Sequence, residues 1–95
     1  MIVSMLQILI EVPGLSSIKE KRRIVKSLKD RLIQKFKLSV AEIDDHDSLR
    51  FIQMGAAIVS NSKVFGESVI QKVFLHIEDN VPGRIIESSI LSEHF

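Results

Sequence analysis

The sequence has no cysteine, no tryptophan and no tyrosine, and only two of its 95 residues are proline. Without cysteine, disulfide bonds and thiolate metal sites are excluded, which fits a reducing compartment. No apolar run reaches the roughly 20 residues of a membrane-spanning helix. The N-terminal stretch lacks the basic start of a signal peptide. We therefore expect a cytoplasmic protein with no membrane partner.

Positive charge is concentrated in one part of the chain. Residues 15–37 include nine basic and two acidic side chains, a formal net charge of +7. Because the whole chain carries +1, the remainder carries −6. A near-neutral protein divided in this way presents a basic patch that suits an anionic partner.

Hydrophobic periodicity divides the chain into six elements of a single domain, residues 1–95. The expected strands are Ile2–Val12, Lys37–Ile43, Leu49–Ser60 and Arg84–Leu91, and the expected helices are Ser17–Phe36 and Lys63–Asp79. The polar turn at residues 44–48 predicts an antiparallel hairpin, and residues 92–95 are expected to fray. The order β-α-β-β-α-β predicts an α+β protein of ferredoxin-like fold, with a four-stranded antiparallel sheet and two helices on one face.

Local signals refine this prediction. The first strand is apolar on both faces, which indicates a central strand or one covered on both sides. Ser17 and Glu20 have capping-box spacing, so each side chain is expected to bond the backbone N–H of the other. Asn61 or Ser62 is expected to cap the second helix. Gly55 within a strand indicates a bulge or the close approach of a helix.

The first helix has two adjoining surfaces. Apolar residues recur at three- and four-residue steps and form a stripe for the core: Val25, Leu28, Leu32 and Phe36. Five cationic residues gather on an exposed arc and are the candidate RNA-binding residues: Lys19, Arg22, Arg23, Lys26 and Lys29. The alternative is a solvated helix face that keeps the protein soluble. Lys21 lies on the border, where its stem is expected to extend over the edge of the core.

Several blocks of the sequence resemble the YlxP-like family, also known as domain of unknown function family 503. The blocks are Pro13-Gly14, Ser17–Arg23, Val40–Asp44, Asp47, Gly55 and Val59–Asn61. The resemblance extends over nearly the whole chain. It implies small bacterial cytosolic proteins of ferredoxin-like fold, often encoded beside translation and ribosome-maturation factors. It implies no established activity and no catalytic residues. Where relatives often have tryptophan after the acidic turn, this chain has Leu49.

Other chemistries have weaker support. The run Asp44-Asp45-His46-Asp47 offers ligands for a divalent cation, but it lacks EF-hand spacing, and aspartate is common in turns for conformational reasons. Within it, Asp47 matches the family block and is a candidate cap for the hairpin backbone. His46, His76 and His94 are scattered and have no nucleophile at a recognisable spacing. We therefore expect no enzyme, no cofactor, no catalytic residue and no metal site.

The leading hypothesis is a non-enzymatic binding module that contacts RNA, either ribosomal RNA or a ribosomal particle, through the five cationic residues. Phosphate contacts of this kind give little base discrimination, and we expect no DNA partner. Base stacking on the sheet is disfavoured, because Phe51 and Phe95 are the only aromatic residues near strands. The alternative is a protein-interaction or homo-oligomeric scaffold that acts through the open sheet face, where Val3, Met5 and Leu9 are expected.

Overall fold

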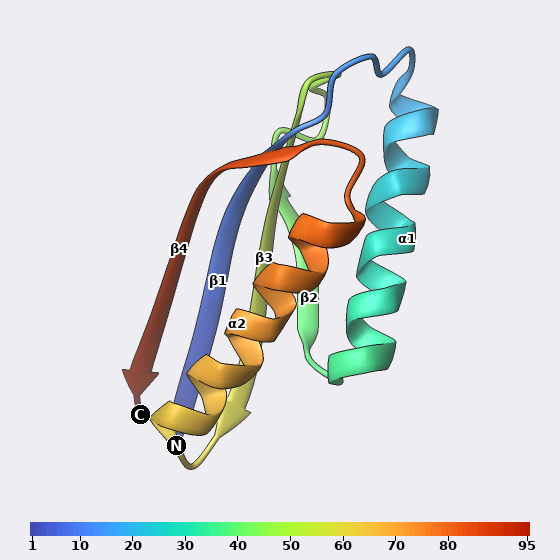
Figure 1. Cartoon of the computed structure of the whole chain (residues 1–95). Coiled ribbons are helices and arrows are strands. Elements are labelled where there is room, and N and C mark those ends of the chain that lie inside the picture. Colours follow the sequence, from blue (N-terminus) through green and yellow to red (C-terminus); the bar gives the residue numbers. More distant parts are fainter.

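In the computed structural model, which describes residues 1–95, two helices cover one face of a four-stranded sheet (Figure 1). The elements in chain order are β1 (Ile2–Glu11), α1 (Ile18–Phe36), β2 (Ser39–Asp44), β3 (Phe51–Ser60), α2 (Lys63–Asn80) and β4 (Arg84–His94). All neighbouring strands are antiparallel, in the order β2-β3-β1-β4. The α+β ferredoxin-like fold predicted from the sequence is confirmed. Neither helix is long and apolar enough to cross a membrane.

β1 is a central strand, as its two apolar faces predict. It pairs with β3 and with β4 along its whole length. Leu6, Ile8 and Ile10 point toward the helices and are at most 1% exposed. Val3 and Leu9 alternate with them on the opposite face and are half-buried, so β1 is covered by protein on one side only.

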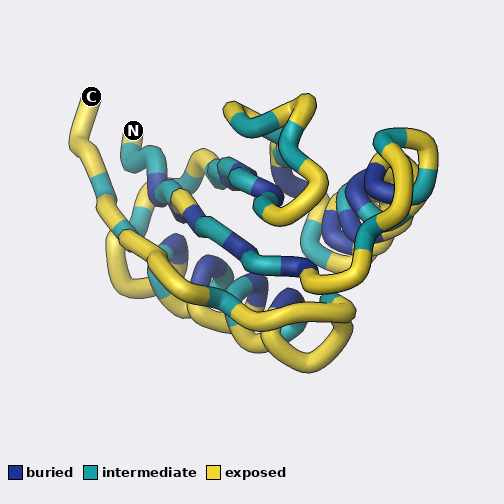
Figure 2. The backbone as a smooth tube through the Cα atoms, turned by 90° about the horizontal axis from the view of Figure 1, so that it is seen from above, coloured by how far each residue is buried: buried dark blue, intermediate teal, exposed yellow.

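The core lies between the sheet and the helix layer (Figure 2). α2 packs across β1, β3 and β4, whereas α1 lies beside α2 and against β2. The predicted stripe of α1 is buried at Val25, Leu28 and Leu32, and Phe36 is half-buried at its end. α2 buries Ile70, Val73 and Ile77 in the same layer.

The start of α1 follows the predicted capping box only in part. The Glu20 N–H donates to the Ser17 hydroxyl at 3.1 Å, as expected. The Glu20 carboxylate, however, accepts from the Ser16 hydroxyl at 2.6 Å and from the Ser16 N–H at 3.3 Å, not from Ser17. Ser16 supplies two donors where Ser17 would supply one. These bonds, the hydroxyl first, lower the pKa of Glu20. At α2 the cap is Ser62, which accepts from the Phe65 N–H at 3.2 Å.

The end of the chain is ordered, so the prediction of a frayed tail is wrong. β4 continues to His94, which pairs with Ile2. Beyond it, the Phe95 N–H donates to the Met1 carbonyl at 2.7 Å. The physical reason is that β1 begins at Ile2 and offers these residues a full set of ladder partners.

Each outer strand of the sheet contains one bulge. The register of β2 on β3 shifts between Glu42 and Asp44, which leaves Ile43 as the extra residue. The register of β4 on β1 shifts in the same way and leaves Ile86 unpaired. The bulge expected at Gly55 therefore lies in the neighbouring strand, and the Ile43 side chain packs over that glycine. A Cβ at Gly55 would lie 3.2 Å from Ile43 Cγ2.

The close approach of a helix occurs at Gly66 rather than at Gly55. A Cβ added to Gly66 would lie 2.2 Å from Ser4 Oγ, so the backbone of α2 packs directly on the Ser4 side chain of β1. The Ser4 and Ser92 hydroxyls lie 2.9 Å apart, and Ser92 donates to Glu67 at 3.0 Å. These bonds satisfy the fully buried Ser4 hydroxyl beneath the helix.

Candidate nucleic-acid interface

The basic face of α1 is the set of five cationic residues predicted from the sequence: Lys19, Arg22, Arg23, Lys26 and Lys29. Lys29 is half-buried and the other four are exposed. At about 100° per residue the five positions share an arc of about 120°, and they extend about 15 Å along the helix axis. The buried stripe adjoins the basic face at Lys29, which explains the partial burial of that residue, and the rest of the basic face is turned away from the core.

Only one residue of the basic face forms a salt bridge within the protein. Lys26 Nζ lies 2.8 Å from Asp30 Oδ2, and this hydrogen bond raises the pKa of Lys26. Both side chains are well exposed, and surface pairs of this kind contribute little to stability. The remaining four residues of the basic face form no salt bridge. Their charge is therefore available to a partner.

Two further cations, Arg31 and Lys35, extend the basic surface toward α2 and were not among the five predicted residues. Arg31 lines a hollow of about 330 Å³ between α1 and residues 80–82, together with Arg23 of the basic face. Arg31 follows Arg23 by two steps of four residues, and this helical spacing was the signal that could have identified it. Lys35 follows one turn after Arg31. Burial lowers the pKa of His76, and the charges of Lys35 and then Arg31 lower it further, so the positive field reaches the helix interface.

Lys21 does not belong to the exposed surface, and the prediction that it lies over the core edge is wrong. Its side chain is 1% exposed. The ammonium donates to the backbone carbonyl of Asp45, and Nζ lies 3.3 Å from Glu42 Oε2. β2 runs beside α1 and supplies this carboxylate, so the charge is paired within the protein. The overlooked signal was Glu42, a charged residue on the helix-facing side of a short strand.

The acidic turn is organised by its own backbone. Asp45 adopts a left-handed conformation (φ 59°) and donates its N–H to Asp44 Oδ1 at 2.8 Å. The Ser48 hydroxyl caps the start of β3 by accepting from the N–H groups two and three residues further on, at 3.1 and 3.0 Å. Asp47 makes none of these bonds, so its predicted capping role is wrong. No group of three or more histidine or acidic side chains is arranged to hold a metal ion.

The three histidines lie in different parts of the fold. His46 Nε2 is 3.9 Å from a carboxylate oxygen of Glu42. His76 packs edge-on against Phe36, with ring centroids 5.9 Å apart, and His94 ends β4. No imidazole is hydrogen-bonded to a serine hydroxyl. The absence of enzymatic activity remains a prediction.

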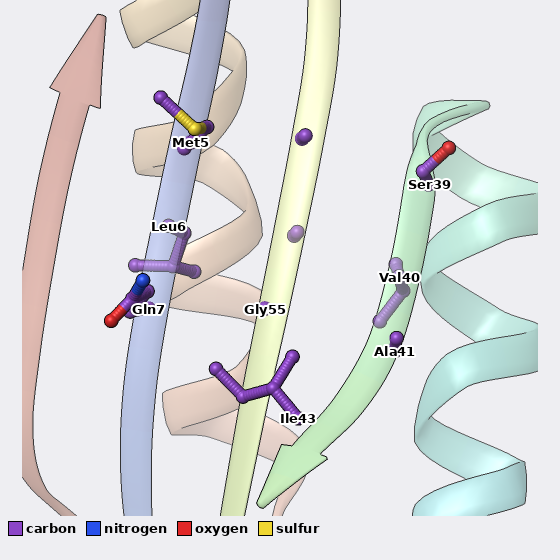
Figure 3. Close-up of a pocket in the computed structure, with 10 residues that line it drawn as sticks. Met5, Leu6, Gln7, Ser39, Val40, Ala41, Ile43 and Gly55 are labelled. Carbon is purple, nitrogen blue, oxygen red and sulfur yellow. The ribbon is translucent and has the colours of Figure 1, made fainter.

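A second candidate surface lies on the other side of the sheet. We call it the open sheet face, and its central residues are Val3, Met5, Gln7, Leu9, Ala41, Ile43, Gly55, Ala57, Val59 and Leu91. Figure 3 views this face, with α2 behind the sheet and α1 beside β2. A shallow hollow of about 310 Å³ lies over Gly55 and Ala57, and Met5 and Ile43 are among the residues that line it.

The fold and the basic face together define an α+β domain of ferredoxin-like topology whose outer layer carries a cationic helix. This chain is similar in structure to a de novo designed protein with a ferredoxin fold, LFR1 1, whose solution structure is known. The match covers 98% of this chain and 84% of the designed chain, with a TM-score of 0.53 and 12% sequence identity. At that identity the likeness concerns the fold alone.

The sequence comparisons then identify the family. The family model described as "Protein of unknown function (DUF503)" matches residues 3–90, and the chain belongs to this family. The chain is also 37% identical over 62 residues to the uncharacterized protein YlxP of Bacillus subtilis (strain 168), a match that covers 65% of this chain and 67% of the relative. The resemblance to the YlxP-like family is thereby confirmed.

Proposed function

We propose that this domain is a non-enzymatic module that binds RNA in the cytoplasm through the basic face of α1. One observation carries the proposal: four of the five cations of the basic face have no ion-pair partner, on a protein whose net charge is only +1. The resemblance to a family encoded beside translation and ribosome-maturation factors points to ribosomal RNA or a ribosomal particle.

The physical basis is the release of counterions from phosphates. Each neutralised phosphate contributes about −0.7 to −0.9 to the slope of log K against log salt, so four or five contacts give a slope of roughly −3 to −4.5. The cations are attached to one helix and keep a fixed spacing along it. They contact phosphates rather than base edges, so affinity changes little with RNA sequence.

The rest of the charge distribution favours one orientation. The acidic turn at residues 44–47 and the β4 carboxylates Glu87 and Glu93 lie outside α1. A polyanion is therefore attracted to the basic face and repelled from other parts of the surface.

The test compares two charge reversals of equal size. The Arg22→Glu/Arg23→Glu variant removes two unpaired cations from the basic face, whereas Lys63→Glu/Lys72→Glu makes the same change at exposed positions of α2. Binding is measured by co-sedimentation with ribosomal subunits at two salt concentrations. We expect the α1 variant to lose binding at both, and the α2 variant to bind as the wild type does. Equal binding by all three proteins would refute the proposal.

A further inference from the structure

The open sheet face is more apolar than a solvated sheet surface requires. Val59 is 61% exposed, Leu91 is 53% exposed and Ile43 is 42% exposed. An antiparallel sheet with one solvent-exposed face normally carries polar side chains on that face. Large contiguous apolar patches on such faces mark interaction sites.

The apolar side chains form one continuous patch. Val3 pairs with Val59 across β1 and β3. In the next row of that face, Met5 lies between Ala57 on one side and Leu91 on the other. Apolar surface therefore crosses three adjacent strands in the row of Met5 and two strands in the row of Val3, where Glu93 occupies the outer position on β4.

The charges around the patch do not suit a nucleic acid. Arg50 and Arg84 lie at one end, and both are bound to Glu11, at 2.7 and 3.2 Å respectively. Glu87 and Glu93 on β4 form no salt bridge. A phosphate chain would meet unpaired carboxylates and no free cation, so the surface fits a protein partner.

The relief of the patch suits a second copy of itself. A twofold interface brings the same surface of both subunits together, so projections and hollows must occur on one face. The open sheet face has both. Its hollow lies over Gly55 and Ala57, and Leu91 is an exposed large side chain two strands away.

The size of the face also agrees with a dimer. Four strands at about 4.8 Å and ten residues at about 3.3 Å give a face of roughly 19 by 33 Å, or about 600 Å² before side-chain relief is counted. Stable interfaces bury about 600–1,000 Å² of accessible surface per partner. The whole open sheet face therefore reaches the lower end of the range for a stable dimer.

We propose that this chain forms a twofold dimer in which the open sheet faces of two copies pack against each other. The arrangement is a four-layered sandwich of helices, sheet, sheet and helices. Each α1 then lies in an outer layer, and the two basic faces are carried on opposite halves of the dimer. The inference concerns the oligomeric state and does not depend on RNA binding.

The first test measures molar mass by light scattering across a series of protein concentrations, at low and high salt and without RNA. We expect a dimer that is insensitive to salt, because the patch is apolar. Met5→Glu is expected to give a folded monomer. Leu75→Glu places the same charge at an exposed position of α2 and is expected to remain dimeric. A wild type that is monomeric throughout, or equal behaviour of the two variants, would overturn the proposal.

The second test does not require a disruptive substitution. The chain has no cysteine, so Leu91→Cys and Leu75→Cys each introduce a single reactive thiol. We expect maleimide labelling at Leu91→Cys to slow at least several-fold as protein concentration rises through the dimerisation range, and labelling at Leu75→Cys to stay constant. Unchanged labelling at both positions would place the contact elsewhere.

Discussion

Lys21 provides the most informative perturbation of the fold, because it is a fully buried cation with identifiable partners. Its ammonium is held by the Asp45 carbonyl and by the Glu42 carboxylate. Glu42 Oε2 is itself buried and receives no aligned hydrogen bond, so its attraction to Lys21 is mainly ionic. The substitution Lys21→Met keeps most of the side-chain volume and removes only the charge.

The magnitude follows from what remains after the substitution. Removing one partner of a buried ion pair costs about 3–5 kcal/mol, since the other charge is left uncompensated. The Glu42 side chain keeps 16% exposure and has His46 at 3.9 Å, so we expect the low end, about 3 kcal/mol. The Asp45 carbonyl retains its bond from the Ser48 N–H at 3.0 Å and adds little to the loss.

A double substitution isolates the pair. Lys21→Met/Glu42→Met replaces both charges by apolar groups, which is often close to neutral, so we expect it to recover at least about 2 kcal/mol of the loss. Stability is measured by urea unfolding with far-ultraviolet circular dichroism, because the chain has no tyrosine or tryptophan to report by fluorescence. Lys19→Met on the exposed side of α1 is the control. A loss below about 1 kcal/mol for Lys21→Met, within the range of ordinary surface changes, would refute the reasoning.

Three further predictions concern local structure. Gly66→Ala should lower stability by about 1–2 kcal/mol in urea unfolding despite better helix propensity, because overpacking outweighs it, and should cost less in a Ser4→Ala background, where the 2.2 Å contact is absent. Lys37→Gly should raise stability by about 1 kcal/mol, seen as a higher Tm, since Lys37 ends α1 in the left-handed region at φ 53°. The folded pKa of His76 lies below its ordinary 6.5, so the unfolded chain binds more protons as the pH falls below that value. The contribution of neutral His76 to folding stability should therefore be intact above pH 6.5 and lost toward lower pH. His76→Gln should reduce the fall of the unfolding free energy on the acid side, measured by urea unfolding at a series of pH values.

Periodicity was sufficient to predict the fold. Strand alternation in β1 and the three- and four-residue steps of α1 depend on burial by the whole protein, so they identify the core without knowledge of specific contacts. The same periodicity separated the basic face from the stripe at Val25, Leu28 and Leu32. These features depend on one-dimensional spacing along an element, which the sequence displays directly.

The errors concern choices between nearby partners. The Glu20 carboxylate bonds to Ser16 instead of Ser17, and the Lys21 ammonium contacts Glu42 instead of solvent. In both cases the three-dimensional path of the neighbouring segment determines which partner lies within hydrogen-bond distance. The order of the tail was missed for the same reason, since the partners of His94 lie at the opposite end of the chain. Spacing within one element does not contain this information.

The bulges at Ile43 and Ile86 bear on how the protein avoids uncontrolled assembly. An outer strand has a row of unpaired N–H and C=O groups that can template the addition of another chain, and a bulge interrupts the regular repeat on which such growth depends. Here both outer strands, β2 and β4, are interrupted in this way. Lateral growth of the sheet is therefore discouraged at both edges, which leaves the faces of the molecule as the surfaces for association.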